Sequence, residues 1–134
     1  MEKIVIRTTK RKQMVDITGQ VSSIVQRSNV KTGLCFVFIP HTTCGITINE
    51  NADPSVRDDL LFFLCELVPE NSGYRHSEGN SDAHIQSSIV GQSVSIIVQD
   101  GNLALGVWQG IFLCEFDGPR TRSVWVQILD IRSS

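Results

Sequence analysis

Histidine is the side chain in this sequence best suited to metal binding and proton transfer, and the chain contains three. His41 opens the segment His41-Thr42-Thr43 after an apolar run, while His76 and His84 flank a polar stretch. Imidazole is the commonest metal ligand, and a catalytic zinc site usually takes three protein ligands. His76 and His84 do not have the i, i+4 spacing of a helical metal pair. Spacing alone therefore leaves two interpretations open, a metal site or hydrogen-bonded surface histidines.

Two carboxylates and one guanidinium form a second set of candidates. Glu50 follows an apolar strand near one end of the sheet, where we also expect His41, and it could act as a general base or support a metal ligand. Asp117 is a candidate base or ligand, and the rigid fork of Arg120 suits a phosphate or a carboxylate. Asp117-Gly118-Pro119 is also typical of a plain turn, so both interpretations stay open.

Several familiar catalytic motifs are missing from the sequence. It has no GxGxxG dinucleotide loop, no GxxxxGK[ST] phosphate loop and no GxSxG nucleophile elbow. The four cysteines form no CxxC pair, which argues against a zinc knuckle or a thioredoxin-type motif. Cys35, Cys65 and Cys114 lie in apolar runs and are predicted to be buried, and a reducing cytoplasm is the natural location.

The first half of the chain is predicted to be rich in strands, with two helices inserted between them. Residues 3–8, a short segment with Met14 and Val15, 34–39 and 45–49 are predicted strands. Residues 18–28 have the spacing of a helix with Thr18 as its N-cap. Asp53-Pro54 predicts the start of a second helix over 54–67. Its buried stripe is expected to comprise five apolar residues: Val56, Leu60, Leu61, Leu64 and Leu67.

The second half is predicted to hold one short helix and several hairpins. The helix covers about residues 81–89 and carries Ala83, Ile85 and Ile89. Residues 94–98 and 103–107 form a hairpin around Asp100-Gly101. Residues 110–116 and 123–131 are predicted to form the last hairpin. This order indicates an α+β fold with mostly antiparallel sheet layers and two or three helices.

The length of 134 residues suggests a single domain over residues 1–134. Hydrophobic residues make up 41% of the chain and the net charge is −2, which excludes intrinsic disorder and argues against binding nucleic acid or a membrane surface. The strands at 34–39 and 111–116 are apolar on both sides, but three short helices can cover only about one sheet face. We therefore expect a second sheet layer or another subunit, and hence a homo-oligomer.

Three segments of the sequence together resemble the YjbQ-like family, known as secondary thiamine-phosphate synthase enzymes. They are His41-Thr42-Thr43 with Ile46 to Pro54, Arg75 to Asn80 with Ala83-His84, and Gly106 to Ile111 with Cys114 to Arg120. The resemblance covers nearly the whole chain. Cys44-Gly45 departs from the small residues common after the HTT motif, which affects local packing only.

This resemblance implies a homotrimer or a multiple of it, and a divalent metal near the histidines, with zinc as the expected ion. The family's histidine positions fall on His41, His76 and His84, and its acidic and arginine positions on Glu50, Asp117 and Arg120. The activity it implies joins hydroxymethylpyrimidine diphosphate and thiazole phosphate to give thiamine phosphate, as a minor activity beside an unsettled main role.

Three functions remain open from the sequence. The first is metal-assisted transfer on a phosphorylated small molecule, with the metal and Arg120 balancing the phosphate charge. The second is a metal-dependent phosphate-ester hydrolase, which would use metal-bound water. The third is a non-enzymatic trimeric protein in which the histidines bind a structural metal at a subunit interface.

Overall fold

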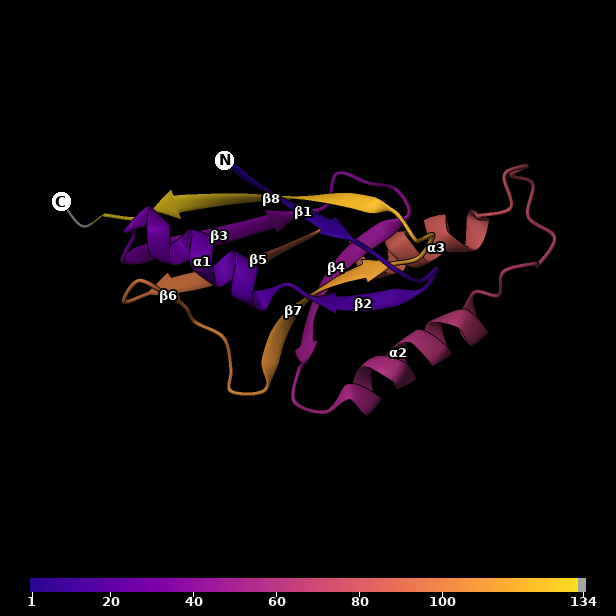
Figure 1. Ribbon diagram of the computed structural model, residues 1–134, viewed down its shortest axis with the longest axis horizontal. Helices are drawn as coiled ribbons and strands as arrows, with labels where there is room; N and C mark the ends of the chain where they lie inside the picture. Colours follow the sequence, from indigo (N-terminus) through magenta and orange to yellow (C-terminus); the bar gives the residue numbers. More distant parts are fainter. Residues whose placement is uncertain (133–134) are drawn as a thin grey trace.

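The computed structural model describes residues 1–132, so residues 133 and 134 of the predicted single domain lie outside the described part. In residues 1–132 the chain forms two antiparallel sheets and three helices (Figure 1). The strands are β1 (Glu2–Arg7), β2 (Gln13–Asp16), β3 (Thr32–Phe38), β4 (Cys44–Glu50), β5 (Ser93–Gln99), β6 (Asn102–Leu103), β7 (Gln109–Glu115) and β8 (Thr121–Asp130). The helices are α1 (Thr18–Ser28), α2 (Pro54–Leu67) and α3 (Ser81–Val90). The predicted α+β class is confirmed.

The two sheets have the strand orders β1-β8-β3-β5-β6 and β2-β7-β4. β8 pairs with β1 and β3, whereas β7 pairs with β2 and β4. The predicted last hairpin, 110–116 with 123–131, is therefore wrong. The segment from Asp117 to Arg120 instead carries the chain from the smaller sheet to the larger one. The hairpin of β5 with β6 is confirmed, although β6 is only two residues long.

Strand β7 separates two hydrophobic cores, because both of its faces are buried. Ile111 and Leu113 face the first core, which lies between α1, the smaller sheet and the inner face of the larger sheet. Phe112, Cys114 and Phe116 face the second core, on the side of α2 and α3. The alternation follows from the period-two geometry of a strand. A strand that is apolar on both faces needs a layer on each side, which explains why β7 lies in the middle.

The helices begin where local signals place them, with one correction. Asp53 caps α2, because its Oδ1 accepts a hydrogen bond of 3.0 Å from the backbone N–H of Ser55, and Pro54 follows at the first position. Thr18 is the first residue of α1 and not its cap, a position that Ile17 occupies. No helix within the described residues is long and apolar enough to span a membrane.

The predicted buried stripe of α2 is wrong. Of residues 54–67 none is fully buried, and Leu67 remains 57% exposed. α2 lies at the edge of the molecule (Figure 1), with Leu60, Leu61 and Leu64 packed only partly against the second core. Cys65, predicted to be buried, is only partly so. One chain thus offers α2 too little surface to cover its apolar residues.

Helix α3 shows an inverted pattern of burial. Asp82, Gln86 and Ser87 are buried, while Ile85 and Ile89 are exposed. The polar side chains face inward because they bond to the rest of the chain. Ser87 donates to the carbonyl of Cys44, for example, over 2.7 Å. The apolar side chains are therefore left toward the outside of the chain.

The outer face of the larger sheet is also apolar and open. Phe36 and Phe38 on β3 are 41% and 43% exposed, and Ile97 on β5 and Leu129 on β8 are exposed beside them. No second layer covers this face within residues 1–132. Cover by another subunit therefore stays a prediction, and this face is where we expect it.

Truncation of a buried valine in the first core tests the packing. Val37 on β3 is 0% exposed, so Val37→Ala should lower the free energy of unfolding by about 2 kcal/mol. The control is Val107→Ala, the same substitution at a valine that is 85% exposed, and it should leave the free energy of unfolding nearly unchanged. Urea unfolding measures both variants. Equal losses in the two would contradict the assigned core.

Candidate functional site

Three segments of the chain, residues 40–43, 78–84 and 120–122, meet around a cavity of about 370 Å³. The loop after β3 contributes His41, and Thr43 stands just before β4. Asn80, at the start of α3, lies on another side, and the beginning of β8 supplies Arg122. Residues distant in the sequence thus converge at one end of the two sheets, because β3 and β7 end here while β4 and β8 begin here.

A buried ion pair lies beneath this cavity. Glu115 at the end of β7 is 0% exposed and Arg122 on β8 is 4% exposed. The guanidinium donates from Nε to Oε1 of Glu115 over 2.9 Å and from Nη2 to Oε2. Thr8 and the backbone N–H of Asp117 also donate to this carboxylate, over 2.7 and 3.1 Å. The carboxylate is therefore almost fully bonded, as a charge buried in a protein must be.

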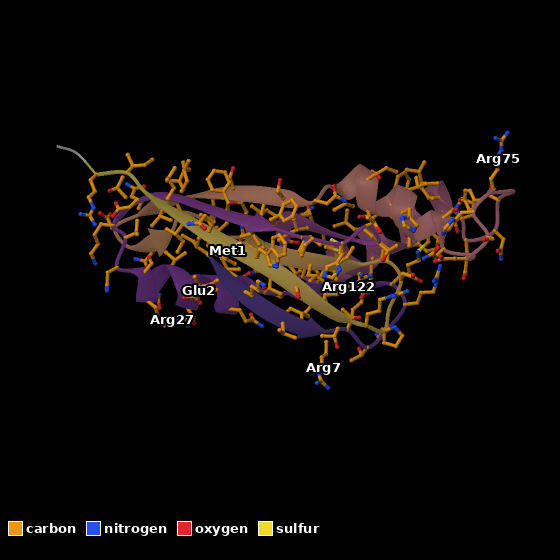
Figure 2. All side chains as sticks on the ribbon, turned by 90° about the horizontal axis from the view of Figure 1, so that it is seen from above. Met1, Glu2, Arg7, Arg27, Arg75 and Arg122 are labelled. Atoms are coloured by element: carbon orange, nitrogen blue, oxygen red, sulfur yellow. The ribbon has the colours of Figure 1, made fainter. Side chains whose placement is uncertain are left out.

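The guanidinium of Arg122 also holds the start of β4 and keeps one nitrogen free. Its Nη2 donates to the carbonyl and to the Oγ1 of Thr43, over 3.1 and 2.8 Å. Among residues 1–132, Nη1 has no hydrogen-bond partner, yet it is not enclosed, and Arg122 lines the cavity. Figure 2 shows Arg122 inside the molecule, whereas Arg7 and Arg75 extend away from it. A buried cation therefore faces the cavity with a donor to spare.

The two charges keep each other ionised. Burial by itself would raise the pKa of Glu115, but hydrogen bonds from Arg122 and Thr8 outweigh it, and the pKa of Glu115 is lowered. The pKa of Arg122 is raised, because the bonds and charge of Glu115 outweigh its own burial. Both groups thus stay charged at neutral pH.

Asp117 is the centre of a second cluster of charges. Its carboxylate accepts hydrogen bonds from Arg11 (2.7 Å), from Arg120 (2.7 Å) and from Asn80 (2.9 Å). Burial would raise the pKa of Asp117, but the bonds from Asn80 and Arg120 lower it. The predicted base is thus an ionised carboxylate whose oxygens already bind three donors. Its evident role is to hold Arg120 at the rim of the cavity.

Asn80 leaves an acceptor unused beside the same cavity. Its Nδ2 binds Asp117, but its Oδ1 is enclosed and has no donor within the described part of the chain. Asn80 is 9% exposed and lines the cavity. A buried amide oxygen without a partner costs free energy, and because Oδ1 is enclosed this cost belongs to the fold and not to an open binding position.

The three histidines lie in one neighbourhood, but in different roles. His41 and His84 line the same cavity. The rings of His76 and His84 stand edge to face with centroids 5.4 Å apart. Nε2 of His41 accepts a hydrogen bond of 2.9 Å from the backbone N–H of Ser123. Burial, followed by the charge of Arg122, lowers the pKa of His41, so this ring is neutral at pH 7.

Glu50 is not brought to this cavity within one chain. It ends β4 opposite Gln109, while Cys44 begins β4 opposite Glu115. A strand of seven residues, at about 3.3 Å per residue, places Glu50 roughly 20 Å from the site. The expected proximity of Glu50 and His41 is absent from the described chain because β4 runs between them.

The predicted metal ligands do not complete a centre in one chain. Over residues 1–132, no three His, Cys, Asp or Glu side chains are grouped so that they could hold a metal ion. His76 and His84 are neighbours, but the Nε2 lone pair of His41 is already used by Ser123. The three histidines together therefore do not fit a three-ligand zinc site here.

A second, larger hollow adjoins the polar cavity. It has a volume of about 510 Å³ and shares His41, Thr42 and His84 with it. The larger hollow is bordered by Phe38 and Ile39, which do not line the polar cavity, so its wall is more apolar. The two hollows therefore share part of their lining, with arginines beside one and apolar side chains beside the other.

Arg122 and Glu115 were missed as site residues by reasoning from sequence, although both carry a signal. Arg122 lies on the same face of β8 as Val124 and Val126, which are both buried in the core. Glu115 interrupts an apolar run whose two faces are both buried. Opposite charges at two inward strand positions predict a buried pair.

Comparison with known proteins identifies relatives along the whole chain. The family model described as "UPF0047 protein YjbQ-like" matches residues 2–131. A UPF0047 protein of Methanocaldococcus jannaschii is 56% identical over 124 residues, which cover 92% of this chain and 90% of that protein. The UPF0047 protein YugU of Bacillus subtilis is 50% identical over 125 residues, covering 92% and 95%.

Solved structures agree with these sequence matches. A crystal structure of a YjbQ/UPF0047 family protein from Clostridium acetobutylicum has a TM-score of 0.95 at 49% identity, covering 96% of this chain and 100% of that one. A YjbQ-like protein of unknown function from Sulfolobus solfataricus has a TM-score of 0.94 at 34% identity, covering 97% and 96%.

The buried pair predicts a pH-dependent effect of Glu115→Gln. The substitution leaves the charge of Arg122 buried without its partner, so at pH 7 it should lower the free energy of unfolding by about 3 kcal/mol. Because the folded pKa of Glu115 is lowered, its contribution is complete above the ordinary value of 4.5 and is lost as the pH falls through the folded pKa. Urea unfolding between pH 7 and pH 3 should therefore show the difference from wild type narrowing.

Glu66→Gln serves as the control, since Glu66 is an exposed residue of α2. It should leave stability unchanged across the same pH range. A difference between wild type and Glu115→Gln that stays constant from pH 7 to pH 3 would contradict the assignment of an ionised buried carboxylate.

Proposed function

The chain belongs to the UPF0047 family of YjbQ-like proteins, and we propose that it is an enzyme that binds the phosphate or diphosphate group of a small molecule beside Arg122. One observation carries the proposal. A guanidinium that is 4% exposed faces a cavity with a free nitrogen, and Arg120 and His84 line the same space. A charged donor with little water around it binds an anion more strongly than a surface arginine does.

Formation of thiamine phosphate is the specific reaction we propose. Hydroxymethylpyrimidine diphosphate would lose its diphosphate as the thiazole nitrogen bonds to the pyrimidine methylene carbon. Arg120 and Arg122 would hold the leaving diphosphate and stabilise the charge that develops on it. The apolar hollow beside Phe38 is wide enough to receive a ring, at about 510 Å³. This role makes no use of Asp117 as a base, because that carboxylate holds Arg120.

The proposed assembly is a homotrimer or a multiple of it. The open apolar face of the larger sheet supports it, as do the exposed Ile85 and Ile89 of α3. Glu50 could reach a site only from another copy, given its distance along β4. A divalent metal, with zinc the proposed ion, could find two ligands in His76 and His84. Further ligands would have to come from outside the chain, so no step is derived through the ion.

Arg120→Gln tests the anion site without disturbing the buried pair. Half of the Arg120 side chain is exposed, so the variant should fold. Loss of one charged hydrogen bond should weaken binding of inorganic pyrophosphate about tenfold, measured by titration calorimetry. Arg7→Gln removes an outward arginine on β1 and should bind pyrophosphate as wild type does (Figure 2). Equal affinity in wild type and Arg120→Gln would contradict the proposed site.

Purified protein with both thiamine precursors tests the reaction itself. We expect thiamine phosphate and pyrophosphate as products, and a slower reaction in Arg120→Gln than in Arg7→Gln. The same assay after complete removal of metal shows whether an ion takes part. Unchanged product formation would eliminate a catalytic metal.

Other outcomes of this assay separate the alternative functions. If the protein releases phosphate from simple phosphate esters and chelation of metal abolishes this release, the result would favour the metal-dependent hydrolase. Absence of any turnover, with a lower solution mass or thermal stability for His84→Ala, would favour the non-enzymatic trimeric metal-binding protein. Either result would contradict the proposed synthase activity.

A further inference from the structure

We infer that His41 serves this site as a hydrogen-bond donor through Nδ1–H, and not as a metal ligand. Nε2 of His41 lies 2.9 Å from the backbone nitrogen of Ser123, which can only donate. Nε2 must therefore carry its lone pair and not a proton. A neutral imidazole has one protonated nitrogen, so the proton is on Nδ1.

The strand register explains why Ser123 needs this acceptor. The pairing of β3 with β8 ends at Phe38 opposite Trp125. Pro40 would be the next partner of Ser123, but β3 has already ended there. The ring of His41 replaces the missing backbone acceptor and satisfies the N–H of Ser123. Leaving that N–H unbonded would be costly, which fixes the orientation of the ring.

This arrangement removes both lone pairs that a metal could use. A metal ligand needs an unprotonated nitrogen, but Nδ1 of His41 carries the proton and Nε2 is bonded to Ser123. If the proton were on Nε2, it would point at the N–H of Ser123, and two donors would face each other without an acceptor. The charged imidazolium would have the same conflict, and burial together with the charge of Arg122 also opposes it.

Nδ1–H is in turn available to a ligand. Nδ1 has no hydrogen-bond partner in residues 1–132 and is not enclosed, and His41 lines both the polar cavity and the apolar hollow. The donor stands on the same cavity as Arg122 and Arg120, so an oxygen of an anionic ligand fits it. This last step rests on the proposed anion site, whereas the position of the proton does not.

Long-range nitrogen–proton correlation spectra of the ¹⁵N-labelled protein test the inference. The chain has three histidines, so His41→Gln, His76→Gln and His84→Gln assign every ring. In the free protein at neutral pH we expect Nδ1 of His41 protonated and Nε2 bare. Inorganic pyrophosphate should shift Nδ1 of His41. Zinc should leave both of its nitrogens unchanged, and His41→Gln should alter zinc affinity less than His84→Gln does.

Three results would overturn the inference: a proton on Nε2 of His41 in the free protein, a zinc-induced shift at either nitrogen, or zinc binding that His41→Gln weakens as much as His84→Gln. Failure of pyrophosphate to bind at all would count against the proposed function. The spectra of the free protein would still decide where the proton is. Pyrophosphate that binds through Arg120 without shifting Nδ1 would refute the donor role alone.

Discussion

Glu115 and Arg122 are buried side by side, and this pair of opposite charges holds the ends of four strands together. Glu115 ends β7 and Arg122 begins β8, while Thr8 follows β1 and Thr43 precedes β4. Either charge alone would be too costly to bury, so each requires the other in place. A site built on such strand ends holds its donors in fixed directions before any ligand arrives.

The charges around this pair divide into those that hold the fold and those that remain free. Asp117 is occupied by Arg11, Arg120 and Asn80, and so it ties the loop before β8 to the start of α3. Within residues 1–132, the accessible nitrogens left without a partner are Nη1 of Arg122 and Nδ1 of His41. Both residues line one cavity. These donor atoms without partners, and not the number of charged residues, are the features that suggest a ligand.

Local signals in the sequence predict where helices and strands lie better than they predict which strands pair with one another. Asp53-Pro54 is enough to place the start of α2, because capping involves neighbouring residues only. The pairing of β7 and β8 could not be read in the same way, since short loops also connect strands of different sheets. The prediction that the apolar stripe of α2 is buried was wrong for a related reason. Its apolar spacing is real, but Leu67 has no surface in the same chain to pack against. His41 and His84 line one cavity and His76 lies beside His84, an arrangement that the spacing of the histidines did not predict. The bond from Ser123 to His41 depends on a strand register that no motif encodes.

A crystal structure of the protein soaked with pyrophosphate tests the central claim most directly. The account predicts a phosphate oxygen within hydrogen-bond distance of Nη1 of Arg122, with Arg120 on the same anion and the Glu115–Arg122 pair unchanged. Pyrophosphate bound elsewhere would contradict it. So would a cavity filled by a side chain of a neighbouring subunit, because the free nitrogen of Arg122 would then serve assembly and not a ligand.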